Sequence, residues 1–187
     1  AGLLEKNAVL PAVLAGYSWG AWLSILLASR HPGLVKKLIL ISSGPFKPEY
    51  AAKIQSTRMK RLKPSEMDEI NFLLDALDNP AARNKDRIFA RIGELMSKAD
   101  SYRIMDQPDV KIELDSGIYR KVWKEAEALR SDGRLLKAAG TIKCPVTAIH
   151  GDFDSHPAEG VNAPLSGVIK DFKFVLLKKC GHTPWTE

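Results

Sequence analysis

One serine lies at a glycine-flanked corner of the chain, in the pentapeptide GYSWG that spans residues 16–20. An apolar run precedes this corner, and a segment with helical spacing follows it. A strand that turns directly into a helix makes a tight corner, and bulky side chains at Gly16 and Gly20 would collide with the neighbouring backbone. The corner also points the first helical N–H groups at the space above Ser18, where they favour negative charge. The spacing predicts a nucleophilic serine, and the alternative is a serine that caps the helix between two packing glycines.

A serine hydroxyl is a weak nucleophile without a base, and the base needs an acid that orients it. The sequence offers four histidines as bases, namely His31, His150, His156 and His182. His31 ends the helical segment beside a proline, and His150 lies within an apolar run. His182 follows the last apolar run, between Gly181 and Pro184, in a loop that these residues would hold tightly. We therefore expect His182 to be the base, against the alternative of an ordinary surface-loop histidine.

Two aspartates, Asp152 and Asp154, follow the third apolar run in the stretch HGDFDSHP, residues 150–157. Catalytic groups of parallel sheets gather where the strands end, and Ser18, the two aspartates and His182 all follow predicted strands. With about 4.8 Å between strands, Ser18 and the last of four strands lie roughly 14 Å apart, so the His182 loop must fold back to reach the serine. The residues themselves leave the choice between the two aspartates open.

The predicted strands are four apolar runs, at residues 8–16, 35–42, 144–151 and 172–180. The segment between the first two has one apolar helical face and ends at the His31-Pro32 pair. A strand, a helix and a strand with short connections make a right-handed crossover, which makes the strands parallel. Continuous apolar strands fit a sheet that is covered on both faces.

Residues 45–135 interrupt this alternation with three or four predicted helices. Ser65 and Asp68 have the spacing of a capping box, Asn79 and Pro80 are typical of a helix start, and Gly133 is typical of a helix end. The predicted apolar faces are Met67, Ile70, Leu74 and Leu77, then Ile88, Ile92, Leu95 and Ala99, then Ile118, Val122, Trp123, Ala126 and Leu129. We interpret the insertion as a helical subdomain that can also serve as a lid over a pocket.

The order of these motifs resembles the α/β-hydrolase superfamily. A serine corner, a helical insertion, a G-x-x-D turn and a late G-H loop follow one another as in that family, over essentially the whole chain. The resemblance implies an α/β fold with a three-layer, mostly parallel sheet. It implies a partial core of residues 1–44 and 136–187 and an inserted helical cap of residues 45–135.

The same resemblance implies the roles of individual residues. Ser18 would be the nucleophile, His182 the general base and Asp154 the acid, with Asp152 as the alternative acid. The backbone N–H of Trp19 would form part of the oxyanion hole.

The resemblance predicts a serine hydrolase that cleaves a small ester, thioester or amide through an acyl-enzyme, with no cofactor and no metal. A proline-iminopeptidase-like aminopeptidase is an alternative, because the SWG at the corner resembles those enzymes; it would need an acidic site for the substrate amine. A non-catalytic binding protein of the same fold is the alternative outside the enzymes.

The sequence departs from the family at both ends. Few residues precede the first predicted strand, where the family has further strands and a loop that supplies a second oxyanion donor. We therefore expect a part of a longer protein, or its ordered part, with weak or no activity alone, since one lost oxyanion donor costs roughly 100-fold or more in turnover. An exposed apolar edge at residues 8–16 would also invite self-association.

The composition is that of an ordinary globular protein of 187 residues, 45% hydrophobic and 27% charged, with a net charge of +6. No apolar run is long enough for a membrane span, and the first residues do not read as a signal peptide. Residues 53–63 hold five cations, but no interleaved aromatic residues suggest base stacking. We interpret them as a solvated helix face, and we expect a cytoplasmic protein with a small-molecule substrate and neither nucleic-acid nor membrane partners.

The cysteines and tryptophans give smaller predictions. Cys144 and Cys180 are expected at opposite edges of the parallel sheet, roughly 20 Å apart, too far for a disulfide. Trp22 and Trp123 are core candidates, whereas Trp19 and Trp185 are candidates for either the core or the wall of the site.

Overall fold

The computed structural model describes residues 1–79, 81–103 and 116–187. The strands of this part form one sheet in the order β1, β2, β3, β4, and each neighbouring pair is parallel. Their bounds are β1 (Ala12–Tyr17), β2 (Val35–Ile41), β3 (Val146–Gly151) and β4 (Phe172–Leu177). The predicted parallel sheet is confirmed, with strand ends that differ from the predicted ones by a few residues.

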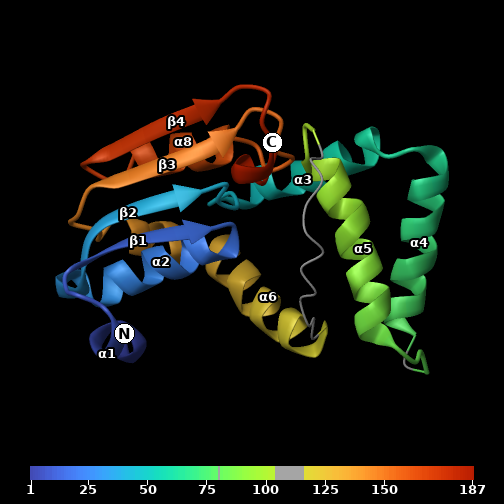
Figure 1. Ribbon diagram of the computed structural model, residues 1–187, viewed down its shortest axis with the longest axis horizontal. Helices are drawn as coiled ribbons and strands as arrows, with labels where there is room; N and C mark the ends of the chain where they lie inside the picture. Colours follow the sequence, from blue (N-terminus) through green and yellow to red (C-terminus); the bar gives the residue numbers. More distant parts are fainter. Residues whose placement is uncertain (80, 104–115) are drawn as a thin grey trace.

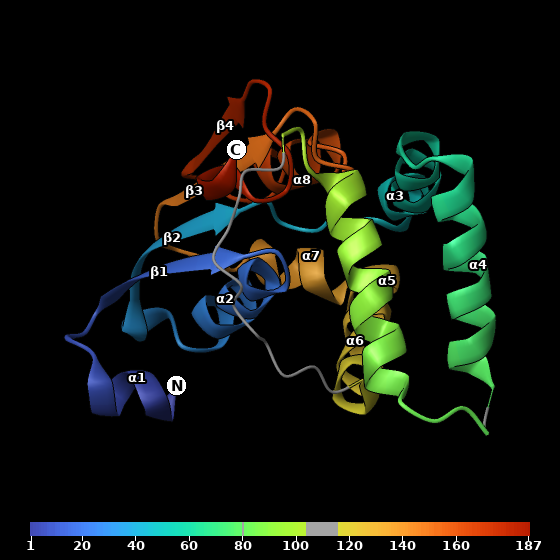
Figure 2. The same cartoon turned by 45° about the vertical axis from the view of Figure 1, so that its right-hand side comes forward.

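Helices cover one face of this sheet and the carboxyl ends of its strands. The described α-helices are α1 (Gly2–Asn7), α2 (Trp19–Arg30), α3 (Pro48–Arg61), α4 (Pro64–Asp78), α5 (Lys85–Asp100), α6 (Ser116–Ser131), α7 (Arg134–Ala139) and α8 (Glu159–Ser166). We call α3, α4, α5 and α6 the insertion helices, because they lie entirely within residues 45–135, the predicted insertion between β2 and β3. Helices α3 and α5 stand at the carboxyl ends of the strands, and α4 lies farthest from the sheet (Figure 1 and Figure 2).

Two rows of side chains on one face of the sheet form the main core. In register, the rows are Leu14, Leu38, Val146 and Phe172, then Gly16, Leu40, Ala148 and Phe174. Trp22 and Ile25 of α2, Leu135 of α7 and Leu165 of α8 pack on these rows and are almost fully buried. Each such side chain stabilises the fold by about 1.5–3 kcal/mol relative to an exposed one. This core fixes the strand ends that carry the site.

The opposite face of the sheet is more open. Its central row is Ala15, Ile39, Thr147 and Lys173, which are exposed or partly exposed. The expectation of a sheet covered on both faces is therefore too strong for the described part of the chain.

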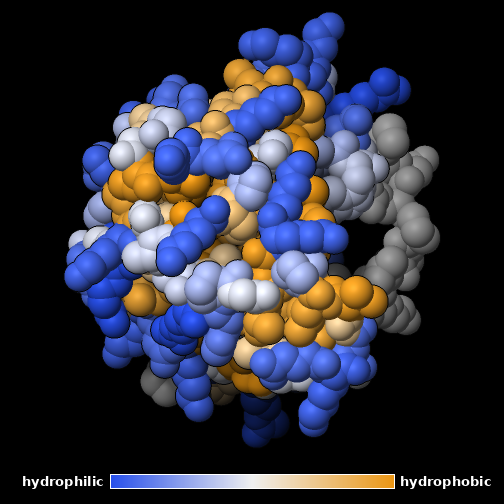
Figure 3. Space-filling model, turned by 90° about the vertical axis from the view of Figure 1, so that its left-hand side faces the viewer, coloured by the Kyte–Doolittle hydropathy of each residue, from blue (hydrophilic) through white to orange (hydrophobic). Residues whose placement is uncertain are grey.

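The edge strand β1 and the segment before it carry exposed apolar side chains. Leu3, Val9 and Val13 are 80%, 93% and 46% exposed. The view from the side where the strands begin shows apolar patches between charged side chains (Figure 3). Apolar residues at an open strand edge favour pairing with another chain, so self-association through β1 stays a prediction.

Helices α4 and α5 share a small core of their own, built on Ile70, Leu95 and Ala99. The predicted apolar face of α5 is confirmed. On α4 the prediction is wrong at Leu74, which is 38% exposed, while Leu73 packs on the cluster. The contact face of α4 follows positions 67, 70 and 73, which are three residues apart.

The predicted start of α4 is wrong. The helix begins at Pro64, whose missing N–H suits the first helical turn, rather than after a Ser65–Asp68 capping box. A carboxylate oxygen of Glu66 accepts the backbone N–H of Lys63 at 2.9 Å, which satisfies one free donor at this end.

The predicted start of α5 is also wrong. The helix begins at Lys85 after Asn84, whereas Asn79 ends α4. The Asn79 side chain accepts the backbone N–H of Ala81 at 2.9 Å, so this residue makes a turn instead of a cap. Residue 80, which was expected to open the helix, lies outside the described residues.

Both cysteines are free thiols, with Cys144 just before β3 and Cys180 just after β4. They flank opposite ends of parallel strands, as predicted. Within the described ranges, none of the helices combines the length and the apolar character needed to cross a lipid bilayer.

Candidate active site

The serine corner is as tight as the sequence predicts. Strand β1 ends at Tyr17 and α2 begins at Trp19, so Ser18 alone makes the turn, with φ 50° and ψ −117°. A positive φ is unusual for a residue with a side chain and stores strain. A Cβ at Gly16 would lie 2.3 Å from the carbonyl oxygen of Gly20, so only glycine fits there. The same requirement predicted for Gly20 is wrong, because a Cβ at that position would meet nothing within 4 Å.

A chain of hydrogen bonds joins three predicted site residues that come from different strand ends. The Ser18 hydroxyl lies 3.1 Å from Nε2 of His182. Nδ1 of the same imidazole lies 2.7 Å from Oδ2 of Asp154. With the proton on Nδ1, the imidazole donates to the carboxylate and its Nε2 accepts the serine hydroxyl. The structure thus places the His182 imidazole within hydrogen-bond reach of both Ser18 and Asp154.

Asp154 is enclosed by imidazoles. Its Oδ1 accepts the backbone N–H of His156 at 2.9 Å and lies 2.8 Å from that residue's Nδ1. Nε2 of His150 lies 3.4 Å from Oδ2. Burial alone would raise the pKa of Asp154, but the hydrogen bonds from His156 and His182 outweigh burial and hold the pKa well below its usual range. The carboxylate is therefore ionised at neutral pH, in the state that can orient an imidazole.

Asp152, the alternative acid, occupies a different environment. Its carboxylate accepts the backbone N–H of Cys180 at 3.4 Å and lies 3.7 Å from the Lys178 ammonium. Its side chain is 30% exposed, whereas that of Asp154 is inaccessible to solvent. Of the two aspartates that the sequence left open, Asp154 contacts the His182 imidazole, whereas Asp152 contacts Cys180 and Lys178.

His156 is a site residue that sequence reasoning missed. Its ring stacks on that of His182, with centroids 4.5 Å apart and planes 25° apart. The two histidines take one oxygen each of the same carboxylate. The sequence Asp154-Ser155-His156 was the available signal, because it places an imidazole two residues after the acid. The stacking of His156 on His182 depends on the loop after β4, which the local sequence does not show.

Tyr17 and Trp19 flank the serine on either side. Tyr17 lies 5.1 Å from the His182 ring between centroids, and burial, together with the charge of Asp154, raises its pKa above the usual range. It is therefore neutral at physiological pH. Trp19 is the first residue of α2, so its backbone N–H is one of the helix donors without an intrahelical partner.

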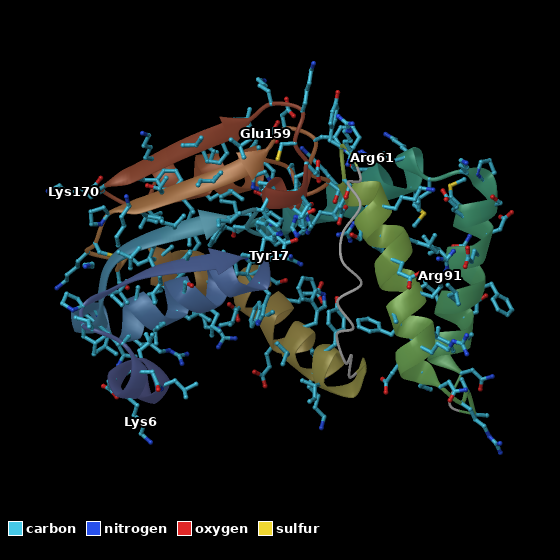
Figure 4. All side chains as sticks on the ribbon, in the orientation of Figure 1. Lys6, Tyr17, Arg61, Arg91, Glu159 and Lys170 are labelled. Atoms are coloured by element: carbon cyan, nitrogen blue, oxygen red, sulfur yellow. The ribbon has the colours of Figure 1, made fainter. Side chains whose placement is uncertain are left out.

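A cavity of about 740 Å³ lies between the insertion helices and the loops that carry Ser18, His156 and His182. Its apolar lining is Trp19, Ile54, Met96, Ile118, Tyr119, Val122 and Trp123. Ser18, His156 and His182 line the same cavity, as do Arg58 and Asp100. Tyr17 marks this position at the end of β1 in Figure 4. A substrate that fills the cavity can therefore reach the serine.

Two tryptophan predictions change in the structure. Trp123 was expected in the core but is 37% exposed and lines the cavity, where it stacks between Trp22 and Tyr119. Trp185 is 58% exposed and contacts Tyr17 edge-on.

The site also contains possible metal ligands. Asp154, His156 and His182 each offer one ligand atom, and these atoms lie within 4.8 Å of one another. Both imidazoles already pair with the carboxylate, so a metal ion would have to replace the hydrogen bonds that orient His182.

Known proteins share this architecture. The crystal structure of VinJ superposes with a TM-score of 0.60 over 98% of this chain, at 18% identity. The chain has the α/β-hydrolase fold. A second α/β-hydrolase-like match is an N-acyl homoserine lactone degrading enzyme, with a TM-score of 0.52 over 96% of the chain and 20% identity. The chain spans 63% and 64% of the lengths of these two proteins.

Sequence comparison also finds a distant relative. A pimeloyl-[acyl-carrier protein] methyl ester esterase from Chromobacterium violaceum is 26% identical over 99% of this chain and 68% of its own length. No family model matches the sequence. The chain is therefore a distant sequence relative of this esterase and has the α/β-hydrolase fold.

Proposed function

We propose that the chain carries the active site of a serine hydrolase that cleaves carboxylic esters with an apolar acyl group. The observation that supports this most directly is the continuous path of hydrogen bonds from Ser18 through His182 to Asp154. Each member has the chemical type that its position requires: a hydroxyl nucleophile, an imidazole base and an ionised acid.

In the proposed reaction, Nε2 of His182 takes the proton of Ser18 as the serine oxygen attacks the ester carbonyl. The imidazolium that forms is stabilised by Asp154 and then gives its proton to the leaving alkoxide. The acyl group remains on Ser18. A water molecule, deprotonated by His182, then attacks this acyl-enzyme. The bond between the acyl carbon and the Ser18 oxygen breaks, His182 returns the proton to that oxygen, and the acid is released.

The negative oxygen of each tetrahedral intermediate needs N–H donors. We assign one of them to the backbone of Trp19, because the first N–H groups of α2 are free of helical partners and favour negative charge. The expectation that this chain alone turns over weakly, for want of a second donor, stays a prediction that an esterase assay of the chain tests.

The proposed substrate class rests on the cavity. Most of its apolar and aromatic lining residues come from the insertion helices, and Ile118, Tyr119, Val122 and Trp123 all lie on α6. Such a lining favours an acyl chain or ring over a sugar or a charged peptide. The curated relative is named as a methyl ester esterase, and ester hydrolysis is consistent with that name.

An aminopeptidase is less well supported. It would need an unpaired carboxylate for the substrate amine, and the carboxylate that lines the described cavity is Asp100. Both oxygens of Asp100 already accept hydrogen bonds from Arg58, and one also accepts the Ser155 hydroxyl.

A fluorophosphonate probe tests the proposal, because it modifies only an activated serine. We expect covalent labelling of the native chain and none of Ser18→Ala. Asp154→Asn should lower the labelling rate and kcat by about 10⁴-fold, since the imidazole then adopts the wrong tautomer. Asp152→Asn is the matched control and should stay within severalfold of the native protein. Labelling that persists in Ser18→Ala, or is lost equally in both aspartate variants, would exclude the assignment.

A further inference from the structure

Asp100, the last residue of α5, is a buried acid that the proposed reaction does not use. It is 4% exposed. Arg58 of α3 donates to both of its oxygens, from Nε at 2.8 Å and from Nη2 at 2.6 Å. The Ser155 hydroxyl donates to the same carboxylate. Ser155 follows Asp154 directly, so Asp100 contacts the loop that carries the acid.

The backbone of Asp100 contacts the loop that carries the base. Its carbonyl oxygen accepts the backbone N–H of His182 at 3.0 Å. The approach is close enough that a Cβ on Gly181 would lie 2.2 Å from that oxygen. One residue therefore holds both catalytic loops, through its side chain on one and its backbone on the other.

Helix α3 reinforces this contact with a second arginine. Arg61 donates to the carbonyl oxygen of Ala99 at 2.9 Å, and its guanidinium lies 3.8 Å from the ring centroid of Phe153, which precedes Asp154. Figure 4 shows Arg61 where α3 meets the end of α5 and the loop after β3. The interpretation of residues 53–63 as a solvated face is therefore wrong for Arg58 and Arg61. We call Arg58, Arg61, Asp100, Ser155 and the backbone of His182 the Asp100 junction.

We propose that Asp100 is a positioning residue, which sets the relative placement of Asp154 and His182 and couples it to the insertion helices. The proposal rests on the proposed function, since it concerns the same serine, base and acid. A carboxylate suits this role because a guanidinium and a carboxylate pair in a fixed planar geometry, which defines orientation as well as distance.

The competing explanation is that Asp100 merely joins α3 to α5. Asp100→Asn distinguishes the two, because it keeps the shape of the side chain and removes one acceptor and the charge. Ser155→Ala removes only the link between Asp100 and the acid loop. Glu69→Gln is the matched control, because Glu69 makes the same two-pronged pair with Arg91 between α4 and α5, away from the loops.

We expect Asp100→Asn to lower kcat and the labelling rate of Ser18 by about tenfold to a hundredfold, with KM within threefold, because small displacements of catalytic groups cost rate rather than affinity. Ser155→Ala should act in the same direction and less strongly. Glu69→Gln should stay within twofold of the native protein.

A spectroscopic readout keeps the test independent of turnover. The imidazole proton between His182 and Asp154 gives a low-field proton NMR signal, which is assigned by its loss in Asp154→Asn. We expect this signal to shift or broaden in Asp100→Asn and Ser155→Ala and to persist in Glu69→Gln. Absent labelling of the native chain would contradict the proposed function alone, and the NMR comparison would still decide the role of Asp100.

An unchanged low-field signal and native labelling rates in a folded Asp100→Asn would overturn the proposal. Circular dichroism establishes whether that variant is folded. Should it not fold, Ser155→Ala carries the decision, and a native signal and rate in that variant would equally overturn it.

Discussion

The insertion helices contain two arginine–carboxylate pairs of nearly identical geometry in different surroundings. At the inner end, Arg58 pairs with Asp100 beside the loops that carry Ser155 and His182, and their side chains are 20% and 6% exposed. At the outer end, Arg91 grips Glu69 between α5 and α4 at 2.7 and 3.0 Å, and their side chains are 45% and 36% exposed. Figure 4 shows Arg91 on the outer helices, well away from Tyr17 at the end of β1.

This difference shows that the same contact has different consequences at the two ends. An exposed ion pair gains little, because water and salt screen it and two long side chains lose freedom. A buried pair is not a large gain either, but removal of one partner leaves a charge without solvent. Arg91 also pairs with a second acid, Glu94. Asp100, in contrast, accepts hydrogen bonds from the backbone of His182 and from the Ser155 hydroxyl. We therefore expect substitutions at the Arg58–Asp100 pair to lower stability and reactivity, and substitutions at the Arg91–Glu69 pair to change them little.

Within this comparison, the largest expected effect is on the labelling rate of Ser18, when alanine replaces a glycine that contacts the Asp100 carbonyl rather than a glycine with open space around it. Gly181→Ala should lower the labelling rate of Ser18 by about 100-fold, because the new Cβ would force the base loop away from the Asp100 carbonyl. Gly33→Ala, in the short turn Pro32–Leu34 outside the cavity lining, adds a Cβ that meets nothing within 4 Å, so it should keep the labelling rate and stabilise the protein by about 0.4–1 kcal/mol. Labelling kinetics and thermal unfolding measure both. Equal labelling rates in the two variants would break the comparison.

A smaller effect is expected on stability when each arginine is removed. Arg58→Ala should lower the free energy of unfolding by about 3 kcal/mol, because it leaves the buried Asp100 carboxylate without its cation. Arg91→Ala should change it little, and added salt should shrink the change further. Denaturant unfolding at low and high salt gives both values. A larger loss for Arg91→Ala would reverse the assignment of inner and outer ends.

The smallest expected effect appears in acid. The pKa of Asp154 is depressed in the folded state, so its contribution to stability is complete above the ordinary aspartate pKa of about 3.9 and is lost as the pH falls through the folded value. The difference in unfolding free energy between the native protein and Asp154→Asn should shrink as the pH falls below about 4. Glu69→Gln should show only a small difference throughout. A difference between the native protein and Asp154→Asn that stays unchanged well below pH 4 would contradict the depressed pKa of this acid.

The sequence is sufficient to predict those parts of the site whose residues lie close together along the chain. Gly16, Ser18 and the following apolar face lie within a few residues of one another, so their spacing alone predicts the strand, the corner and the helix. The alternation of apolar runs likewise predicts the parallel order of the sheet, because short connections permit few topologies.

The rest depends on contacts between distant segments. The two aspartates at 152 and 154 have the same type and almost the same position, and only the return of the loop after β4 separates their environments. Asp100 meets Arg58 from 42 residues away and Ser155 from 55 residues away, and no local pattern marks such a residue. The same lack of local signal explains why a run of five cations was interpreted as a solvated face.

The link between the Asp100 carbonyl and His182 also limits how the insertion helices can be exchanged. Successive residues of an α-helix are rotated by about 100° and advance by 1.5 Å, so a single deletion within α5 would turn its last carbonyl away from the base loop. A helix exchanged for α5 therefore needs to preserve the helical phase of its final turn, whereas the exposed side chains of α4 can vary more freely than those that pack on α5.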